Sequence, residues 1–418
     1  MQSSGKRKDF ANPFCRSIIL SVGNKWVILV VLLFVTLNIS AKVTPLAQDP
    51  DWSKLDPFQN LWSLESFRSE LKNIYCPRES WWKPWIKFEP GQVLIRKKAG
   101  KEDWYILQCL PISRGEEKDQ NLSVPLEIKT IALDPGHIGG EYAEMEGRSF
   151  RMGEDDFVKE GDLSLKVAKR VKDLLEEKGF KAILVRSNLK PVTKRKPQAF
   201  EALVETWIKE RDFTNLPVEE IEILKRKRRE MLFYRVSEIH ARAKLINEHI
   251  QPDLTICLHL NAAPWGDENK KELVDRNDYH VLVNGCYMGG ELAFDDQRFE
   301  MIFRLLSAWQ KTEQIFAEKV SVSFGRKTGL PAFAYKGPNA LKVGNTPGVW
   351  ARNLLANRIY QCPVIFMEPY IANSKIEYER IQLGPYEGTK NFGLHPRLSL
   401  VEEYAQCLLE GILAATGK

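Results

Sequence analysis

From Glu127 onward, short apolar runs with the length and flanking residues of strands alternate with longer segments of helical periodicity. The predicted strands cover residues 128–134, 181–186, 253–260, 278–283 and 362–368. Helices are predicted over 163–177, over 297–323, near 348–358 and from Ser399 to about Ala415. In the last of these, Ser399 and Glu402 have the spacing of a capping box. This alternation predicts an α/β domain with a twisted, mostly parallel sheet and helices on both faces.

Residues 42–125 have a different pattern, rich in Trp and Pro. Short alternating segments at 92–95 and 104–107 predict a small β-rich domain, which would precede the α/β domain at 126–418. The aromatic cluster around Trp81, Trp82 and Trp85 fits either a packed core or a platform for a sugar. Cys76 and Cys109 could form a disulfide if the chain folds in an oxidising compartment.

An apparent insertion at about 188–236 interrupts the strand and helix alternation. Pro217 could open a long helix whose apolar positions continue to Ile246, and the same segment carries the basic run 225–229. The basic run is typical of a solvated helix face. It would also suit contact with anionic lipid, with an envelope polymer or with a partner protein.

The first 41 residues carry five basic residues and one acid, followed by the apolar run WVILVVLLFVTL at 26–37. A basic start, a short apolar stretch and a small residue at its end are typical of an export signal. An uncleaved anchor that associates with the membrane through residues 17–41 is the alternative. Either interpretation predicts that the rest of the chain lies outside the cytoplasm, in the periplasm or cell envelope, and the second predicts that it is anchored to the inner membrane.

Charge and composition narrow the choice of partners. The formal net charge of the whole chain is +6, and most of the excess lies in the first 41 residues. The remainder is nearly neutral, so no overall charge favours nucleic acid as a partner. A hydrophobic content of 44% and a charged content of 28% are ordinary for globular domains and exclude a disordered chain.

Three of the predicted strands end in residues that can bind a metal ion. His137 follows the first strand in Asp134-Pro135-Gly136-His137, His259 lies at the end of the third, and Glu368 ends the last. In open α/β sheets, ligand sites gather at the carboxyl ends of the strands. The coincidence of three such residues favours a shared site.

These segments and their neighbours resemble the zinc-dependent N-acetylmuramoyl-L-alanine amidases, the cell-wall amidases of the amidase-3 family. The similarity extends over roughly residues 127–415, and its order and approximate spacing hold throughout. The segments that carry it are Ile131–His137, Lys159–Leu165, Val185-Arg186, Arg242–Asn247, Asp253–Ala262 and Pro363–Glu368.

The resemblance implies a Zn²⁺ cofactor held by His137, Glu160 and His259, with Glu368 as the catalytic general base and then acid. It further implies substrate contacts from Asn261 and Arg186. The substrate would be peptidoglycan, cut at the amide between N-acetylmuramic acid and L-alanine during wall remodelling or daughter-cell separation. Glu154, Asp155 and Asp156 lie close to Glu160 and are the alternatives for the carboxylate ligand.

The chain departs from the family pattern in two places, at Ile138 directly after the first histidine and in the shortened segment after Glu368. Two other functions remain open: a zinc amidohydrolase or carboxypeptidase of similar fold acting on another amide, and an inactive wall-binding regulator. The insertion adds a hypothesis about regulation. Its long helix could cover the zinc site until an activator protein removes it.

Overall fold

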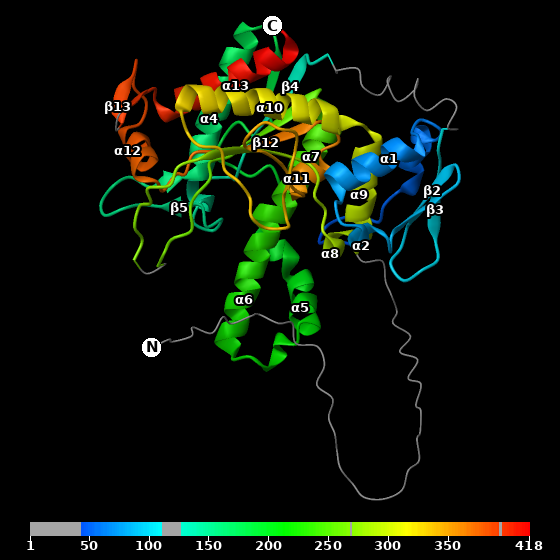
Figure 1. The fold of residues 1–418 in the computed structure, drawn as a ribbon. Helices are drawn as coiled ribbons and strands as arrows, with labels where there is room; N and C mark the ends of the chain where they lie inside the picture. The colour runs from blue at the N-terminus through cyan, green and yellow to red at the C-terminus, as the bar shows by residue number, and fades with distance from the viewer. Residues whose placement is uncertain (1–42, 111–126, 268–269, 393–394) are drawn as a thin grey trace, which may run out of the picture. The chain divides into compact units, whose positions relative to one another are not determined.

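The computed structural model describes residues 43–110, 127–267, 270–392 and 395–418. Its central element is a seven-stranded sheet of order β10-β11-β9-β12-β8-β4-β7 (Figure 1). Four of the six neighbouring pairs are parallel, whereas β9–β12 and β10–β11 are antiparallel. The predicted α/β class is confirmed, with a mixed sheet. The strands are β4 (Thr130–Pro135), β7 (Lys181–Leu184), β8 (Leu254–Leu258), β9 (Tyr279–Val283), β10 (Leu341–Lys342), β11 (Val349–Ala351) and β12 (Val364–Pro369).

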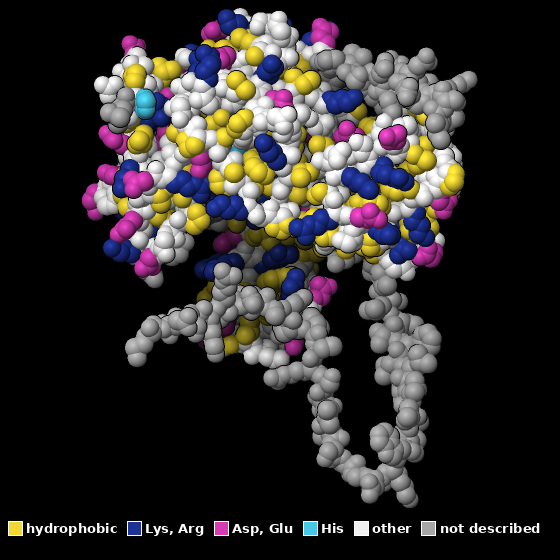
Figure 2. Space-filling model, in the orientation of Figure 1, with side chains coloured by type: hydrophobic (Ala, Val, Ile, Leu, Met, Phe, Trp, Pro, Cys, Tyr) yellow, Lys and Arg dark blue, Asp and Glu magenta, His cyan; other side chains and the backbone are white. Residues whose placement is uncertain are grey.

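The insertion forms a helical hairpin that projects from the sheet (Figure 1). As predicted, Pro217 precedes a long helix, which runs without interruption from Val218 to Ile250 with two π-helical stretches. Hydrophobic and basic side chains are both visible on the hairpin in Figure 2. Its elements are η6 (Pro197–Phe200), α5 (Glu201–Glu210), η7 (Phe213–Asn215), α6 (Val218–Met231), η8 (Leu232–Ser237), α7 (Glu238–Lys244) and η9 (Leu245–Ile250).

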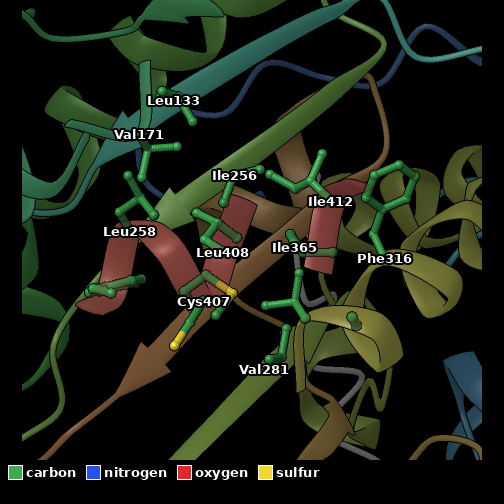
Figure 3. Packing of buried hydrophobic residues seen from close by; sticks show 14 of the residues in the cluster. Leu133, Val171, Ile256, Leu258, Val281, Phe316, Ile365, Cys407, Leu408 and Ile412 are labelled. Carbon is green, nitrogen blue, oxygen red and sulfur yellow. The ribbon is translucent and has the colours of Figure 1, made fainter. Parts of the chain in front are cut away.

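Helices cover both faces of the sheet because successive strand residues point to opposite sides. On one face, Leu133, Ile256 and Ile365 pack against α4 (Glu160–Glu177), α10 (Trp309–Thr328) and α13 (Leu400–Thr416), as Figure 3 shows in part. On the other face, Ala132 and Phe366 pack against α7, η9 and α11 (Leu355–Ile359). The two cores hold the carboxyl ends of β4, β8 and β12 side by side.

The segment before the sheet contains a three-stranded antiparallel sheet, as the alternating segments predict. Short helical elements accompany it, and α9 (Asp295–Leu306) completes their shared core. Trp62 and Trp82 are buried in that core, together with Cys76 and Cys109, which are not joined by a disulfide. The elements are η1 (Trp52–Phe58), α1 (Leu64–Glu70), η2 (Leu71–Tyr75), α2 (Glu79–Trp82), β1 (Ile86–Glu89), β2 (Gln92–Arg96) and β3 (Trp104–Gln108).

Three local predictions differ from the structure. The helix predicted over 297–323 is divided into α9 and α10 at Ala308, which adopts a left-handed φ of 54°. The helix predicted near 348–358 is strand β11 followed by the single turn α11. Ser399 begins α13 as predicted but makes no side-chain cap, and the Glu402 carboxylate pairs with Arg170 at 2.7 Å.

Smaller elements complete the described chain. They are η5 (Gly140–Tyr142), β5 (Ser149–Phe150), β6 (Val158–Lys159), α8 (Gly289–Leu292), α12 (Lys375–Leu383), β13 (Lys390–Phe392) and β14 (His395–Arg397). Within the described ranges, no helix has both the length and the apolar character needed to cross a membrane. The predicted export signal or anchor at 1–41 lies outside the described residues.

Candidate active site

Two histidines and one glutamate meet at the carboxyl ends of β4 and β8. Glu160, the first residue of α4, lies between them: its Oε2 is 3.1 Å from Nε2 of His137, and its Oε1 is 3.0 Å from Nδ1 of His259. One ligand atom from each residue falls within 4.8 Å of the others. The three side chains remain 14–18% exposed, so the site is open to a small ligand.

The backbone around His137 is shaped for this approach. A Cβ on Gly136 would lie 2.3 Å from the His259 ring, so only glycine allows the two segments to come this close. His137 itself has a left-handed φ of 58°, which is unfavourable for a side chain with a Cβ. Tertiary contacts must therefore hold this turn in place.

Arg242 of α7 supplies several of those contacts. It donates to the carbonyl of His137 at 2.8 Å, to the carbonyl of Pro135 at 2.7 Å and to Asp134 Oδ1 at 2.8 Å. Asp134 also accepts a hydrogen bond from Tyr360 at 2.7 Å. The buried Asp134–Arg242 pair thus fixes the turn that presents His137, which gives the aspartate of the Asp-Pro-Gly-His segment a structural role.

Glu146 is a site residue that the sequence analysis did not identify. Its side chain is 1% exposed and accepts hydrogen bonds from the backbone N–H groups of Ile138, at 3.0 Å, and Gly139, at 3.1 Å. One of its oxygens lies 3.6 Å from Nδ1 of His137, the ring nitrogen that does not face Glu160. A carboxylate in this position orients a metal-binding histidine.

Arg186, predicted to bind substrate, is placed differently. The residue is 3% exposed, and its guanidinium donates to the carbonyls of Gly161, at 3.1 Å, and Asn188, at 2.6 Å. Its longer contacts reach the carbonyls of Gly136, at 3.4 Å, and Pro135, at 3.5 Å. Because both of its terminal nitrogens donate to backbone carbonyls, Arg186 supports the His137 turn and the start of α4.

Glu368 ends β12 beside the three-residue cluster. Burial raises the pKa of the Glu368 carboxyl to about 8, and the negative charge of Glu160 acts in the same direction. His137, Arg148 and Arg352 oppose this effect with their positive charge. Burial also favours the neutral form of Glu160, but the interactions with His137 and His259 outweigh the effect of burial and lower the pKa of Glu160. The two carboxyls are therefore held in different protonation states, which suits an acid or base next to a ligand.

The remaining candidates lie at the edges of the site. Asn261 follows β8, is half-buried, and accepts a hydrogen bond from the N–H of Ala262 at 2.8 Å. Glu154, Asp155 and Asp156 are all exposed, and Asp155 accepts a hydrogen bond from the Tyr378 hydroxyl at 3.0 Å. Among the residues that the structure describes, only the set with Glu160 brings three possible ligands together.

The donor chemistry fits a zinc ion. Two imidazole nitrogens and one carboxylate oxygen, converging from three segments, match the ligand set of catalytic zinc sites, which leave one coordination position open. The arrangement also places a second carboxyl, Glu368, next to the position that a substrate would take.

Comparison with known proteins shows what this part of the chain is similar to. Residues 131–273 match the model of the N-acetylmuramoyl-L-alanine amidase family, which confirms the resemblance found in the sequence. The germination-specific N-acetylmuramoyl-L-alanine amidase of Bacillus subtilis (strain 168) is 32% identical over 142 residues, or 34% of this chain. The chain therefore covers 43% of the length of that relative.

Solved structures of amidases are also similar to this chain. The CwlD amidase from Clostridioides difficile, solved in complex with the GerS lipoprotein, has a TM-score of 0.38 and 13% identity. That similarity covers 69% of this chain and 98% of the CwlD chain. The amidase AmiC2 of Nostoc punctiforme has a TM-score of 0.37 and 14% identity, covering 71% of this chain and 100% of its own.

Proposed function

We propose, from the match of residues 131–273 to the model of the N-acetylmuramoyl-L-alanine amidase family, that the chain hydrolyses the amide between N-acetylmuramic acid and L-alanine in peptidoglycan. The observation that carries the proposal is the convergence of His137, Glu160 and His259 beside Glu368. We propose Zn²⁺ as the cofactor. The export segment predicted at 1–41 would place this activity in the periplasm or cell envelope.

In this proposal, each residue of the site has a distinct task. His137, Glu160 and His259 would hold the ion, which supplies Lewis acidity that polarises an amide carbonyl and acidifies water. Glu368 would accept the proton of the attacking water on its carboxylate and then donate it to the leaving amine nitrogen of L-alanine. Burial raises the pKa of Glu368, which favours the protonated form that donates to the leaving amine.

The test is the release of free stem peptides from purified peptidoglycan, followed by mass spectrometry. General acid–base catalysis contributes about 10²–10⁴-fold, so we expect Glu368→Gln to lower the rate by at least about 100-fold. Glu379→Gln, an exposed carboxylate on α12, is the matched control and should not change it. A zinc-loaded wild-type protein that releases no stem peptide would contradict the proposal, as would full activity in Glu368→Gln.

The hairpin of α5 and α6 is the proposed contact for an activator protein. Its base packs around Ile138, the residue directly after His137, through Phe200 and Phe233. Leu203, Val218 and Ile223 are exposed at 45–71%. Much of the basic run is engaged within the hairpin, since Arg229 pairs with Glu201 and Lys225 with Glu205, both at 2.5 Å. An apolar partner surface that adjusts the His137 turn through Ile138 therefore fits better than a purely ionic contact.

The hypothesis that the hairpin covers the site has less support, because the candidate ligand side chains keep 14–18% exposure. We expect Ile223→Glu to reduce peptide release in growing cells but not by the purified enzyme. Lys227→Glu, exposed on the same helix, is the control for added negative charge. A loss of activity in the purified Ile223→Glu protein would refute a role in partner binding.

A further inference from the structure

A second group of polar and aromatic side chains lies next to Glu368, on the side away from the two histidine ligands. In the antiparallel pair of β9 and β12, His280 is directly opposite Glu368. Residues opposite each other in such a pair point to the same face, with their Cβ atoms about 4.5–5.5 Å apart. His280 is thus the first residue encountered when moving from Glu368 across the sheet.

A chain of hydrogen bonds leads outward from His280. The Tyr335 hydroxyl lies 3.0 Å from Nε2 of His280, and Nη1 of Arg352 donates to the same hydroxyl at 3.4 Å. Because the guanidinium can only donate, the hydroxyl accepts from Arg352, and a second hydrogen bond joins the same hydroxyl to His280. Trp350 packs edge-on against the Tyr335 ring, at 5.5 Å between centroids. We call His280, Tyr335, Trp350 and Arg352 the Arg352 cluster.

The cluster has positive charge without a matching carboxylate. Among the described residues, no Asp or Glu oxygen forms an ion pair with Arg352. Most of the buried arginines, such as Arg242, Arg304 and Arg380, have one, whereas Arg186 is hydrogen-bonded to backbone carbonyls. Arg352 is half-buried, stacked over the Tyr335 ring at 5.6 Å. His280 is 2% exposed, and its Nδ1 also lacks a hydrogen-bond partner in the described structure.

An unpaired guanidinium held in place beside a catalytic carboxyl is suited to bind an anion of the substrate. A guanidinium matches a carboxylate with two parallel hydrogen bonds, and partial burial strengthens that interaction. The aromatic rings of Tyr335 and Trp350 would limit access of water and provide an apolar surface for peptide methylene groups. A positive group here would therefore favour amide substrates that carry a negative charge near the bond to be cut.

We propose that the Arg352 cluster is a substrate-binding subsite, in which Arg352 binds a free carboxylate of the stem peptide beyond its L-alanine. This proposal rests on the amidase function proposed above and names the substrate feature that the site selects. Tyr335, oriented by His280, positions the guanidinium. Stem peptides in which that carboxylate is converted to an amide would bind less well, since a neutral amide cannot pair with the guanidinium.

The experiment compares N-acetylmuramoyl-L-alanyl-D-isoglutamate with its isoglutamine analogue, in which the free α-carboxylate is an amide. The γ-carboxyl is converted to an amide in both probes, so that the α-carboxylate is the only peptide carboxylate and the only difference between them. With the zinc-loaded full-length protein, we expect at least a tenfold higher kcat/KM for the carboxylate form. Arg352→Gln should abolish this preference, chiefly by raising KM for the carboxylate form. Arg352→Lys should restore part of the preference because the charge is kept. Lys336→Gln, an exposed neighbour of Tyr335, is the control for lost positive charge.

Binding measured by calorimetry to zinc-loaded Glu368→Gln separates the subsite from turnover. If that protein binds the carboxylate form more tightly than the amide form, and Arg352→Gln in the same background removes the difference, the subsite is supported even if catalysis on these probes fails. Equal binding of both forms would overturn the proposal. An equal loss of activity on both substrates in Arg352→Gln would also overturn it, because Arg352 would then act on Glu368 and not on the substrate.

Discussion

Glu146 provides the sharpest test of how the chain builds its proposed metal site. Its carboxylate accepts hydrogen bonds from the N–H groups of Ile138 and Gly139 and lies 3.6 Å from the second ring nitrogen of His137. Glu146→Gln keeps the size of the side chain but leaves one acceptor oxygen and adds an NH₂ group, which cannot accept from either backbone donor. We therefore expect the orientation of His137 to loosen.

The size of the expected loss in zinc affinity follows from the role of the Glu146 carboxylate, which supports the candidate ligand His137. Loss of such supports typically weakens metal binding by about 10–100-fold. This corresponds to about 1.4–2.7 kcal/mol of binding free energy. Since the side chain is 1% exposed, water cannot replace the lost interactions, and the upper half of this range is expected.

The assay is competition for zinc between the purified protein and a chromophoric chelator at fixed pH. Glu154→Gln is the matched control, since it removes one negative charge from an exposed position in the same part of the chain. An affinity of Glu146→Gln within twofold of wild type would refute the assigned role. Equal weakening by Glu154→Gln would show that only net charge matters.

Three further predictions concern stability, pH and packing. Arg304 pairs with Glu313 in the interior, so Arg304→Met should lower the free energy of unfolding by about 3–5 kcal/mol in urea titrations. Arg326 belongs to an exposed pair, so Arg326→Gln should lower the free energy of unfolding by less than about 1 kcal/mol. Burial raises the pKa of Glu300 to about 7 against the effect of Arg358, so the folded chain binds this proton more tightly than the unfolded chain. The stabilising contribution of the protonated Glu300 carboxyl is complete below about pH 4.5 and is lost as the pH rises through 7. Glu300→Gln should therefore flatten the loss of stability that is measured between pH 5 and 7.5. Gly136→Ala should weaken zinc binding more than tenfold, because the added Cβ displaces the His259 ring. At Gly290 a Cβ would meet nothing within 4 Å, so Gly290→Ala should leave zinc binding unchanged. Equal effects of the two substitutions would refute the packing argument.

The strands and the candidate ligands could be predicted because their signals are local. Apolar runs that end in His137, His259 and Glu368 report both the strand and the edge of the sheet where it ends. The long helix after Pro217 was likewise visible from its apolar spacing. These features depend on neighbours within a few residues along the chain.

Other features depend on partners distant in the sequence, and local patterns do not reveal them. Glu402 pairs with Arg170, 232 residues away, and the capping box at Ser399 does not form. Segment 349–351 becomes a strand because β9 provides backbone partners for it. Glu146 has an ordinary local context, and only its contacts with the His137 turn show its role. The resemblance implies a substrate contact for Arg186, but a family pattern does not indicate that this side chain is buried.

The most direct test of the central claim is to measure bound zinc and stem-peptide release in parallel on one preparation of the full-length protein. The protein would be stripped with a chelator and then titrated with zinc. We expect peptide release to be absent without metal and to rise in proportion to zinc until one equivalent is bound, with neither binding nor release in His259→Ala. Peptide release that persists in the metal-free protein, or zinc binding that is unchanged in His259→Ala, would contradict the account.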